Sequence, residues 1–196
     1  MADMKAIGII GIEHRLIAAV LHGMRHLVRE IRDHGAQPNF ELFGAMIYYI
    51  DAFPERFHHP KEDKYLFRAL RTRHPDSAPL LDRLEAEHEE GARKIRALEQ
   101  ALARYQHGGT KKIDAFAAAV EEYAEFHWNH MRAEETQVLP LAEAHLSDED
   151  WDSIDQAFLG HSDPLFGVEV GAEFEGLFTR ICNLAPPPIG VGPMPT

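Results

Sequence analysis

Two histidine–glutamate pairs with the same spacing constrain this chain more than any other feature. His58 precedes Glu62 by four residues, and His130 precedes Glu134 by four residues. In a helix, this spacing places both side chains on one face, one turn apart, with about 5–6 Å between their Cβ atoms. The chain therefore has two predicted helical segments that each present an imidazole beside a carboxylate.

Apolar residues recur at helical spacing over four long stretches, which lie near residues 5–33, 39–72, 77–107 and 111–145. Glycines or prolines follow the first and third stretches as stop signals. No stretch has a convincing strand pattern, and no repeat occurs at a fixed period. Because short turns join the long helices, we predict an all-α fold, an up-down-up-down four-helix bundle.

Several residues predict how these helices begin and bend. Asn39 is the expected cap of the second helix, and Ser77 that of the third, with Pro79 in its first turn. Pro54 and Pro60 lie inside the second helix. Each proline removes a backbone donor and crowds the carbonyl four residues earlier, so we predict a kink or bulge there.

The chain is expected to divide into a bundle over residues 1–146, a short C-terminal helical extension over 147–185 and a Pro/Gly-rich tail over 186–196. Residues 147–150 resemble a capping box that opens the first helix of the extension. Residues 164–184 predict one more helix. We expect the extension to pack on the bundle of its own chain rather than to form a dimer contact.

Composition excludes several classes of protein. The formal net charge of −12 argues against a nucleic-acid-binding protein, which normally has a basic surface. The single cysteine, Cys182, excludes an intramolecular disulfide and cysteine-based zinc or iron–sulfur sites. No apolar run approaches the roughly 20 residues that span a bilayer, and no signal peptide is evident. We therefore expect a cytoplasmic protein, monomeric or homodimeric, without a nucleic-acid or membrane partner.

Two further histidines, His14 and His88, lie on the apolar stripes of the first and third helices. One such histidine is usually structural, and one HxxxE pair is more often a surface ion pair. If all four stripes face one core, however, four imidazoles and two carboxylates converge there, as in bundles with two-metal sites. Imidazole suits iron, zinc and copper, and a carboxylate can bridge two ions. The pattern therefore favours a metal site.

At these residues the chain resembles the hemerythrin HHE cation-binding family. The segments HHPKEDKYLF, from residue 58, and HMRAEETQVLP, from residue 130, are similar to its motifs, and the likeness covers roughly residues 8–145. It implies a non-haem di-iron centre with two oxo- or hydroxo-bridged iron ions, terminal histidines and bridging glutamates. The implied metal ligands are His14, His58, Glu62, His88, His130 and Glu134.

Two departures from the oxygen-carrying hemerythrins affect the expected function. Those proteins have a second histidine on the third helix, where this chain has Ala92, and an aspartate where it has Glu135. We therefore expect a centre that binds or reacts with O2, NO or peroxide in sensing, storage or stress protection. The alternatives are an iron-donating repair protein for damaged iron–sulfur centres, or a regulatory module with zinc or another structural metal. Whether the protein is an enzyme stays open, and no catalytic residue is assigned.

Some residues near the pairs have alternative roles. His127 lies near the face of the second pair, as an added ligand or as a hydrogen-bonding neighbour. His59 could replace His58, with Asp63 completing that pair. Otherwise Asp63 and Glu135 are expected to hydrogen-bond to ligating imidazoles.

Overall fold

A computed structural model of the chain describes residues 4–109, 112–160, 181 and 183–185. Every regular element in these ranges is helical, which confirms the predicted all-α class. The elements are α1 (Lys5–His34), α2 (Phe40–Ala52), η1 (Pro54–His58), α3 (His59–Lys61), η2 (Glu62–Phe67), α4 (Arg68–Arg73), η3 (Pro75–Ser77), α5 (Ala78–Gly108), α6 (Ile113–Ala133), η5 (Glu134–Val138), α7 (Leu139–His145) and α8 (Asp148–Leu159).

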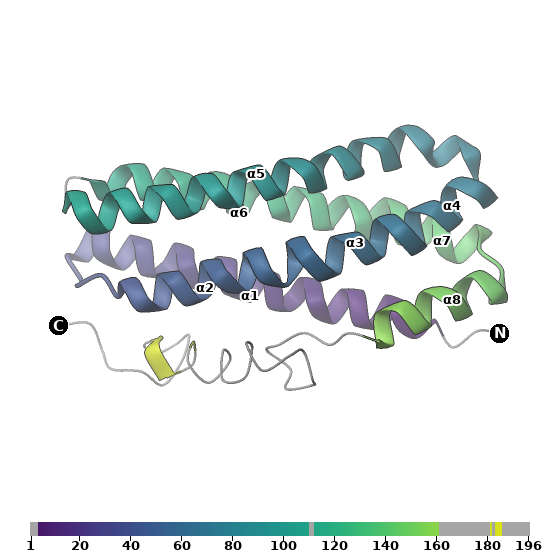
Figure 1. Cartoon of the computed structure of the whole chain (residues 1–196), viewed down its shortest axis with the longest axis horizontal. Coiled ribbons are helices and arrows are strands. Elements are labelled where there is room, and N and C mark those ends of the chain that lie inside the picture. The colour runs from purple at the N-terminus through teal and green to yellow at the C-terminus, as the bar shows by residue number, and fades with distance from the viewer. Residues whose placement is uncertain (1–3, 110–111, 161–180, 182, 186–196) are drawn as a thin grey trace.

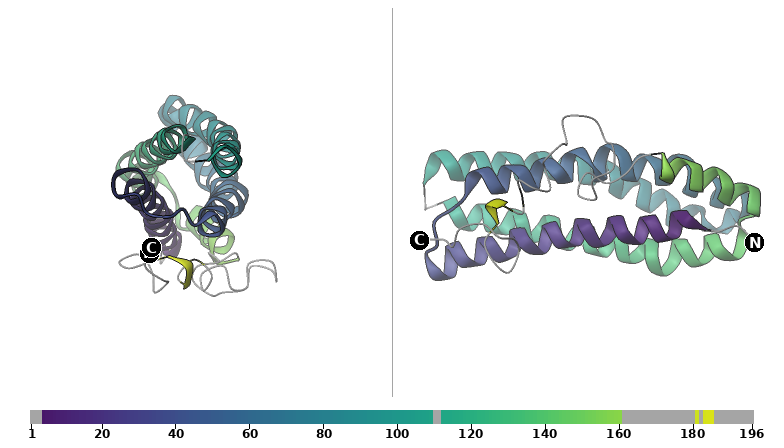
Figure 2. Two further views of the ribbon diagram at one scale, coloured as in Figure 1. Left: turned by 90° about the vertical axis from the view of Figure 1, so that its left-hand side faces the viewer. Right: turned by 90° about the horizontal axis from the view of Figure 1, so that it is seen from below.

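Four long arms run up and down around one core (Figure 1). The first arm is α1, the second runs from α2 through α4, the third is α5, and the fourth runs from α6 through α7. Each arm contacts two neighbours, because α1 packs against α2 and α6, and α5 packs against the same two helices. The end-on view shows this ring of arms (Figure 2). The predicted four-helix bundle is therefore confirmed.

Local capping chemistry explains several of the helix ends. The Asn39 side chain accepts a hydrogen bond from the Leu42 amide at 3.0 Å, as predicted. Gly35 ends α1 in the left-handed region at φ 73°, which a glycine adopts without strain. Ser77 occupies the N-cap position of α5, as predicted, but its hydroxyl donates to the His74 carbonyl at 2.7 Å and makes no capping hydrogen bond.

The second arm is interrupted by two π-helical segments, η1 and η2. Pro54 begins η1, and Pro60 lies in α3 between the two segments, so the predicted bulge is present at the prolines. A third π-helical segment, η5, interrupts the fourth arm and was not predicted. Its signal is Pro140 just beyond it, which provides no amide for the carbonyl four residues earlier.

The apolar core is divided into two clusters along the bundle. Met24 and Phe43 belong to one cluster, and Leu81 and Trp151 belong to the other. On α1, Ile10 lies in the second cluster and Ile17 in the first, with buried Glu13 and His14 between them. A layer of buried polar side chains therefore separates two apolar regions.

Helix α8 packs against α1 at the end of the bundle where the first arm begins. Asp155 of α8 accepts hydrogen bonds from the backbone amides of Lys5 at 3.1 Å and Ala6 at 2.7 Å. These are amides of the first turn of α1, which have no partner within their own helix. The side chain of Asp155 thus accepts hydrogen bonds from backbone amides that would otherwise be unpaired at the start of α1.

The predicted capping box of α8 is present, with Ser147 and Asp150 bonding each other's backbone amides. Asp150 also pairs with Arg73 of α4 at 2.7 Å, so α8 is tied to the second arm as well. The side chains of Trp151 and Phe158, which belong to α8, are buried. The helix predicted over residues 164–184 and Cys182 lie outside the described residues, apart from a helical segment at 181 and 183–184.

By length and composition alone, α1 is apolar enough to cross a membrane. This differs from the sequence-based expectation of no such stretch. Its inward face is buried against α6 and α8 and carries Glu13 and His14. The helix thus has the pattern of a core helix, and its hydropathy does not show insertion into a membrane.

Candidate metal centre

The six side chains predicted as metal ligands meet in the polar layer of the bundle. All four arms contribute, and every one of the six is buried, with exposed fractions from 0% for Glu62 to 7% for His88. Their elements are α1 for His14, η1 for His58, η2 for Glu62, α5 for His88, α6 for His130 and η5 for Glu134.

His14 and His58 form one side of the centre. Their Nε2 atoms lie 3.1 Å apart. Nε2 of His58 is 3.4 Å from Oε1 of Glu62, and Nε2 of His14 is 3.4 Å from Oε2 of Glu134. Both glutamates therefore reach this first pair of imidazoles.

His88 and His130 form the other side. Nε2 of His88 lies 3.7 Å from Oε2 of Glu62 and 3.5 Å from Oε1 of Glu134. Nε2 of His130 lies 3.1 Å from the same Glu134 oxygen. Each glutamate thus lies between both pairs of imidazoles, which is the placement that a carboxylate bridging two ions requires.

Six polar atoms that face the middle of the centre lack a hydrogen bond to the described part of the protein. Both carboxylate oxygens of Glu62 and of Glu134, and Nε2 of His88 and of His130, are buried without a hydrogen bond among the described residues. Leaving such groups unpaired is costly. Ligands about 2.0–2.2 Å from one ion lie roughly 2.8–3.6 Å apart at octahedral or tetrahedral angles. Five of the six spacings above fall in that range, and the sixth, between His88 and Glu62, is 3.7 Å, so the donor set fits metal ions.

The outer nitrogen of each imidazole is held by a carboxylate. A carboxylate on Nδ1 fixes the ring orientation and leaves the Nε2 lone pair free for a metal. The four pairs are His14 with Glu135 at 2.9 Å, His58 with Glu13 at 2.6 Å, His88 with Asp63 at 2.8 Å and His130 with Glu87 at 2.9 Å.

Glu135 and Asp63 were predicted to hold imidazoles, and both do so. Glu13 and Glu87 were missed, although each directly precedes a candidate histidine in the chain. Adjacent helical residues diverge by about 100°. Each therefore turns away from the histidine beside it and reaches one on another arm.

The comparison with known proteins agrees with this geometry. The family model described as the hemerythrin HHE cation binding domain matches residues 6–142. The chain belongs to this family. No curated protein and no solved structure gives a significant match. The matched range contains all six buried side chains, so the hemerythrin family and the site together indicate a protein that binds cations.

Without metal ions, the protein groups of the hemerythrin centre shift one another's pKa values in different directions. Burial disfavours the charged imidazolium, but the Glu134 carboxylate and a second carboxylate partner raise the pKa of His14 and of His130 to about 10. Burial and the neighbouring Glu134 charge raise the pKa of Glu62 well above its usual value. The protein groups therefore hold protons where a cation would replace them.

His58 has a different environment. Burial, with the positive charge of His14, lowers its pKa well below the usual value. Its partner Glu13 also lies 3.4 Å from the ammonium of Lys61, and both groups of this ion pair are buried. Nζ of Lys61 in turn lies 4.5 Å from the ring centre of Phe158 on α8.

The alternative pair of His59 with Asp63 is not formed in the structure. Asp63 is bonded to His88, and His58 keeps its place beside His14. The His59 ring instead stacks on His88 with 4.2 Å between ring centroids. His127 lies 3.5 Å from a Glu55 oxygen, and it does not complete any of the His/Glu groups that could hold an ion.

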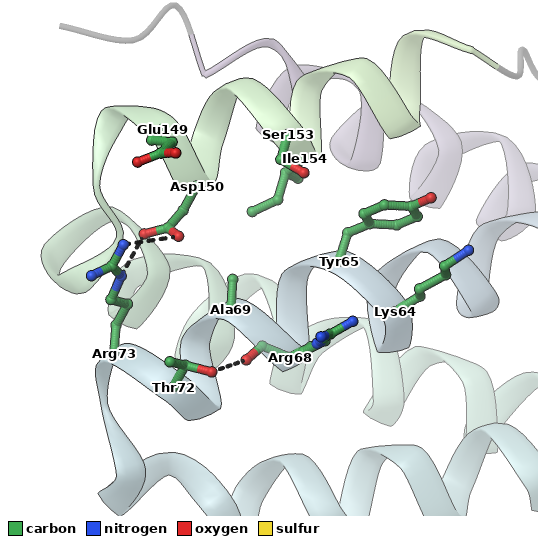
Figure 3. A pocket seen from close by; sticks show the side chains of 10 residues that line it. All are labelled: Lys64, Tyr65, Arg68, Ala69, Thr72, Arg73, Glu149, Asp150, Ser153 and Ile154. Atoms are coloured by element: carbon green, nitrogen blue, oxygen red, sulfur yellow. Dashed lines mark hydrogen bonds and ion pairs between the residues drawn. The ribbon is translucent and has the colours of Figure 1, made fainter.

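A separate surface pocket of about 550 Å3 lies between the second arm and α8 (Figure 3). The ion pair of Arg73 with Asp150 closes one end of it. The other basic side chains that line it are Lys64 and Arg68. None of the six buried side chains of the centre lines this pocket.

Proposed function

We propose that this hemerythrin-family protein binds two iron ions and binds or reacts with O2, NO or peroxide there. The donor set would be His14, His58, Glu62, His88, His130 and Glu134. The observation that carries the proposal is the position of two buried glutamates, whose oxygens have no hydrogen bond to the described residues, between two pairs of imidazoles. A site for a single ion would leave one of the two pairs of imidazoles without an ion to bind.

The chain's own residues suit that task. Two carboxylates bring two negative charges into the apolar interior, and neutral imidazoles add none. The iron pair, when bound, would supply redox chemistry and open coordination positions. The residues around it fix the rings through Nδ1 and exclude bulk water, since apolar clusters lie on both sides of the polar layer. Only a small ligand suits such a buried place.

We infer a role in sensing, storage or stress protection, in the cytoplasm, for a monomer or homodimer. The absence of a second histidine on α5 at Ala92 supports chemistry other than plain oxygen carriage. The strongly held imidazoles support retention of the ions. A zinc or other structural-metal module without redox chemistry is the competing outcome of the test below.

The test is metal analysis of protein purified without air from iron-supplemented cells, with an absorption spectrum before and after air is admitted. We expect two irons per chain, near-ultraviolet charge-transfer bands of a bridged iron pair after exposure to air, and a spectral change with NO or peroxide. One zinc per chain, or a folded protein that retains no metal after exposure to iron, would overturn the proposal.

A further inference from the structure

The surface pocket between the second arm and α8 has no part in the proposed metal centre. Residues of η2 and α4 form one side of it, and residues of α8 form the other. Its volume of about 550 Å3 lies within the range of about 300–1,000 Å3 that is usual for small-molecule sites. The pocket is therefore large enough for a small organic molecule, and its lining indicates which chemistry would fit.

Two basic side chains at one end of the pocket have no acidic partner. Lys64 lies in η2, and Arg68 begins α4 one turn later. Both are exposed, and among the described residues neither forms an ion pair, although the chain has 32 acidic against 20 basic residues. Figure 3 shows both at the end of the pocket away from Arg73. Like charges four residues apart on a helix repel each other, so an anion bound by both would be stabilised.

The opposite end of the pocket has a different charge. Arg73 donates to both carboxylate oxygens of Asp150, at 2.7 Å and 3.2 Å, so this cation is already paired. Glu149 lies at the same end (Figure 3). Its carboxylate repels a second anionic group there. The pocket therefore favours a molecule that carries negative charge at one end only.

An apolar surface lies between the two ends. It is formed by Tyr65, Ala69 and Ile154, of which Ile154 is only 1% exposed. Nζ of Lys64 lies 5.2 Å from the ring centre of Tyr65, within the distance of about 6 Å at which an ammonium is attracted to an aromatic face. The Tyr65 ring thus holds the ammonium at the pocket and adds apolar surface beside it.

We propose that this pocket binds a small organic anion, a molecule with one phosphate or carboxylate group on an apolar body. Lys64 and Arg68 bind the anionic group, and Tyr65, Ala69 and Ile154 contact the apolar body. The site is separate from the proposed iron centre, because none of the six donor residues lines it. The protein thus has a second ligand site whose occupancy does not require iron.

Equilibrium dialysis of the whole chain against phenyl phosphate tests the proposal. This probe combines one anionic group with an apolar ring. We expect saturable binding of one molecule per chain, and weaker binding of inorganic phosphate, which lacks the ring, and of phenol, which lacks the charge. Benzoate is the carboxylate counterpart, and the tighter binder of the two anions identifies the group that the pocket prefers.

Two results of the dialysis would overturn the proposal. One is the absence of saturable binding with both phenyl phosphate and benzoate. The other is inorganic phosphate that binds as tightly as phenyl phosphate, because the basic side chains would then hold an adventitious ion only.

A double variant locates the anionic group. Lys64→Gln/Arg68→Gln removes both cations and should weaken the binding of phenyl phosphate at least about tenfold. The matched control is Arg93→Gln/Arg96→Gln, which changes the net charge equally but removes two exposed cations of α5 that do not line the pocket. Unchanged affinity in the pocket variant, or an equal loss in the control, would overturn the assignment.

A third variant locates the apolar body. Tyr65→Ala should weaken the binding of phenyl phosphate more than that of inorganic phosphate, because only the former has a ring to contact Tyr65. Circular dichroism checks that each variant keeps its helix content. Equal losses for the two ligands in folded Tyr65→Ala would overturn the contact between Tyr65 and the apolar body.

Discussion

Glu13 and His58 meet across two arms of the bundle, with Oε2 of Glu13 2.6 Å from Nδ1 of His58. Glu13 directly precedes His14 in the chain, and Nε2 of His14 faces Nε2 of the same His58 ring. Helix α1 therefore contacts both nitrogens of one imidazole on a different arm. One side of the proposed centre is consequently positioned by a single turn of α1.

Replacing Lys61 by methionine should destabilise the protein by up to about 3 kcal/mol, because it removes the ammonium that offsets the buried Glu13 charge. Urea unfolding of the metal-free protein measures this. The double variant Glu13→Gln/Lys61→Met should recover much of the loss. A single variant as stable as the double would contradict the buried ion pair.

Glu134→Gln should reduce the metal content to one ion per chain or fewer, because it removes a charge that contacts both sides of the centre. The matched control is Glu121→Gln on α6, whose side chain pairs with Arg25 away from the centre. Metal analysis after iron loading and desalting gives the comparison. Equal metal content in the two variants would rule out Glu134 as a bridge.

Metal binding should release protons. His14 and His130 have pKa values of about 10 when only protein groups surround them, so both are charged at pH 7. Ligating imidazoles must be neutral, so about two protons leave from these rings as the ions enter. Titration calorimetry in buffers of different ionisation enthalpy measures the number. A heat of binding that does not depend on the buffer would refute the proton release.

The metal-free protein should lose stability as the pH rises. The pKa of His14 and of His130 is raised from 6.5 to about 10, so their contribution is full below about pH 6.5 and is lost as the pH rises through 10. The urea midpoint of chelator-treated protein should fall between pH 6.5 and pH 9.5. In the double variant His14→Gln/His130→Gln, the urea midpoint should fall less over the same pH range. An equal fall in the variant would show that other groups cause the loss of stability.

Gly91→Ala should lack the stability gain that is usual for this change. An alanine in a helix interior is commonly about 0.5–1 kcal/mol more favourable than a glycine. At Gly91 the new methyl group meets Glu55, whereas at Gly44 of α2 nothing lies within 4 Å. Thermal unfolding of Gly91→Ala and Gly44→Ala compares the two positions. Identical behaviour of the two variants would show that Glu55 moves freely.

The four arms and the convergence of the six candidate ligands could be predicted from the sequence, because both follow from the local periodicity of helices. Helical periodicity places His14 and His88 inward, and spacing by four residues aligns each histidine with its glutamate. Ser77 begins α5 without a side-chain cap, because its hydroxyl donates to the His74 carbonyl.

The contacts between arms were harder to predict. Whether Glu13 or Glu87 faces solvent or a neighbouring imidazole depends on how two helices pack, which one sequence does not specify. The direction of the His59 ring, which lies on His88, depends in addition on the π-helical turn before it. Glu13, Glu87 and His59 lie beside the apolar stripes of their helices, where helical periodicity does not predict which way a side chain points.

Both candidate bridging glutamates begin a π-helical segment, Glu62 in η2 and Glu134 in η5. A widened turn holds an extra residue, and losing that residue would restore ordinary helical winding. In each arm a widened turn follows the imidazole–carboxylate pair, so a one-residue change of length there rotates only the part of the helix beyond the pair. The far parts of the second and fourth arms can therefore change in length while each imidazole keeps its four-residue spacing from its own carboxylate.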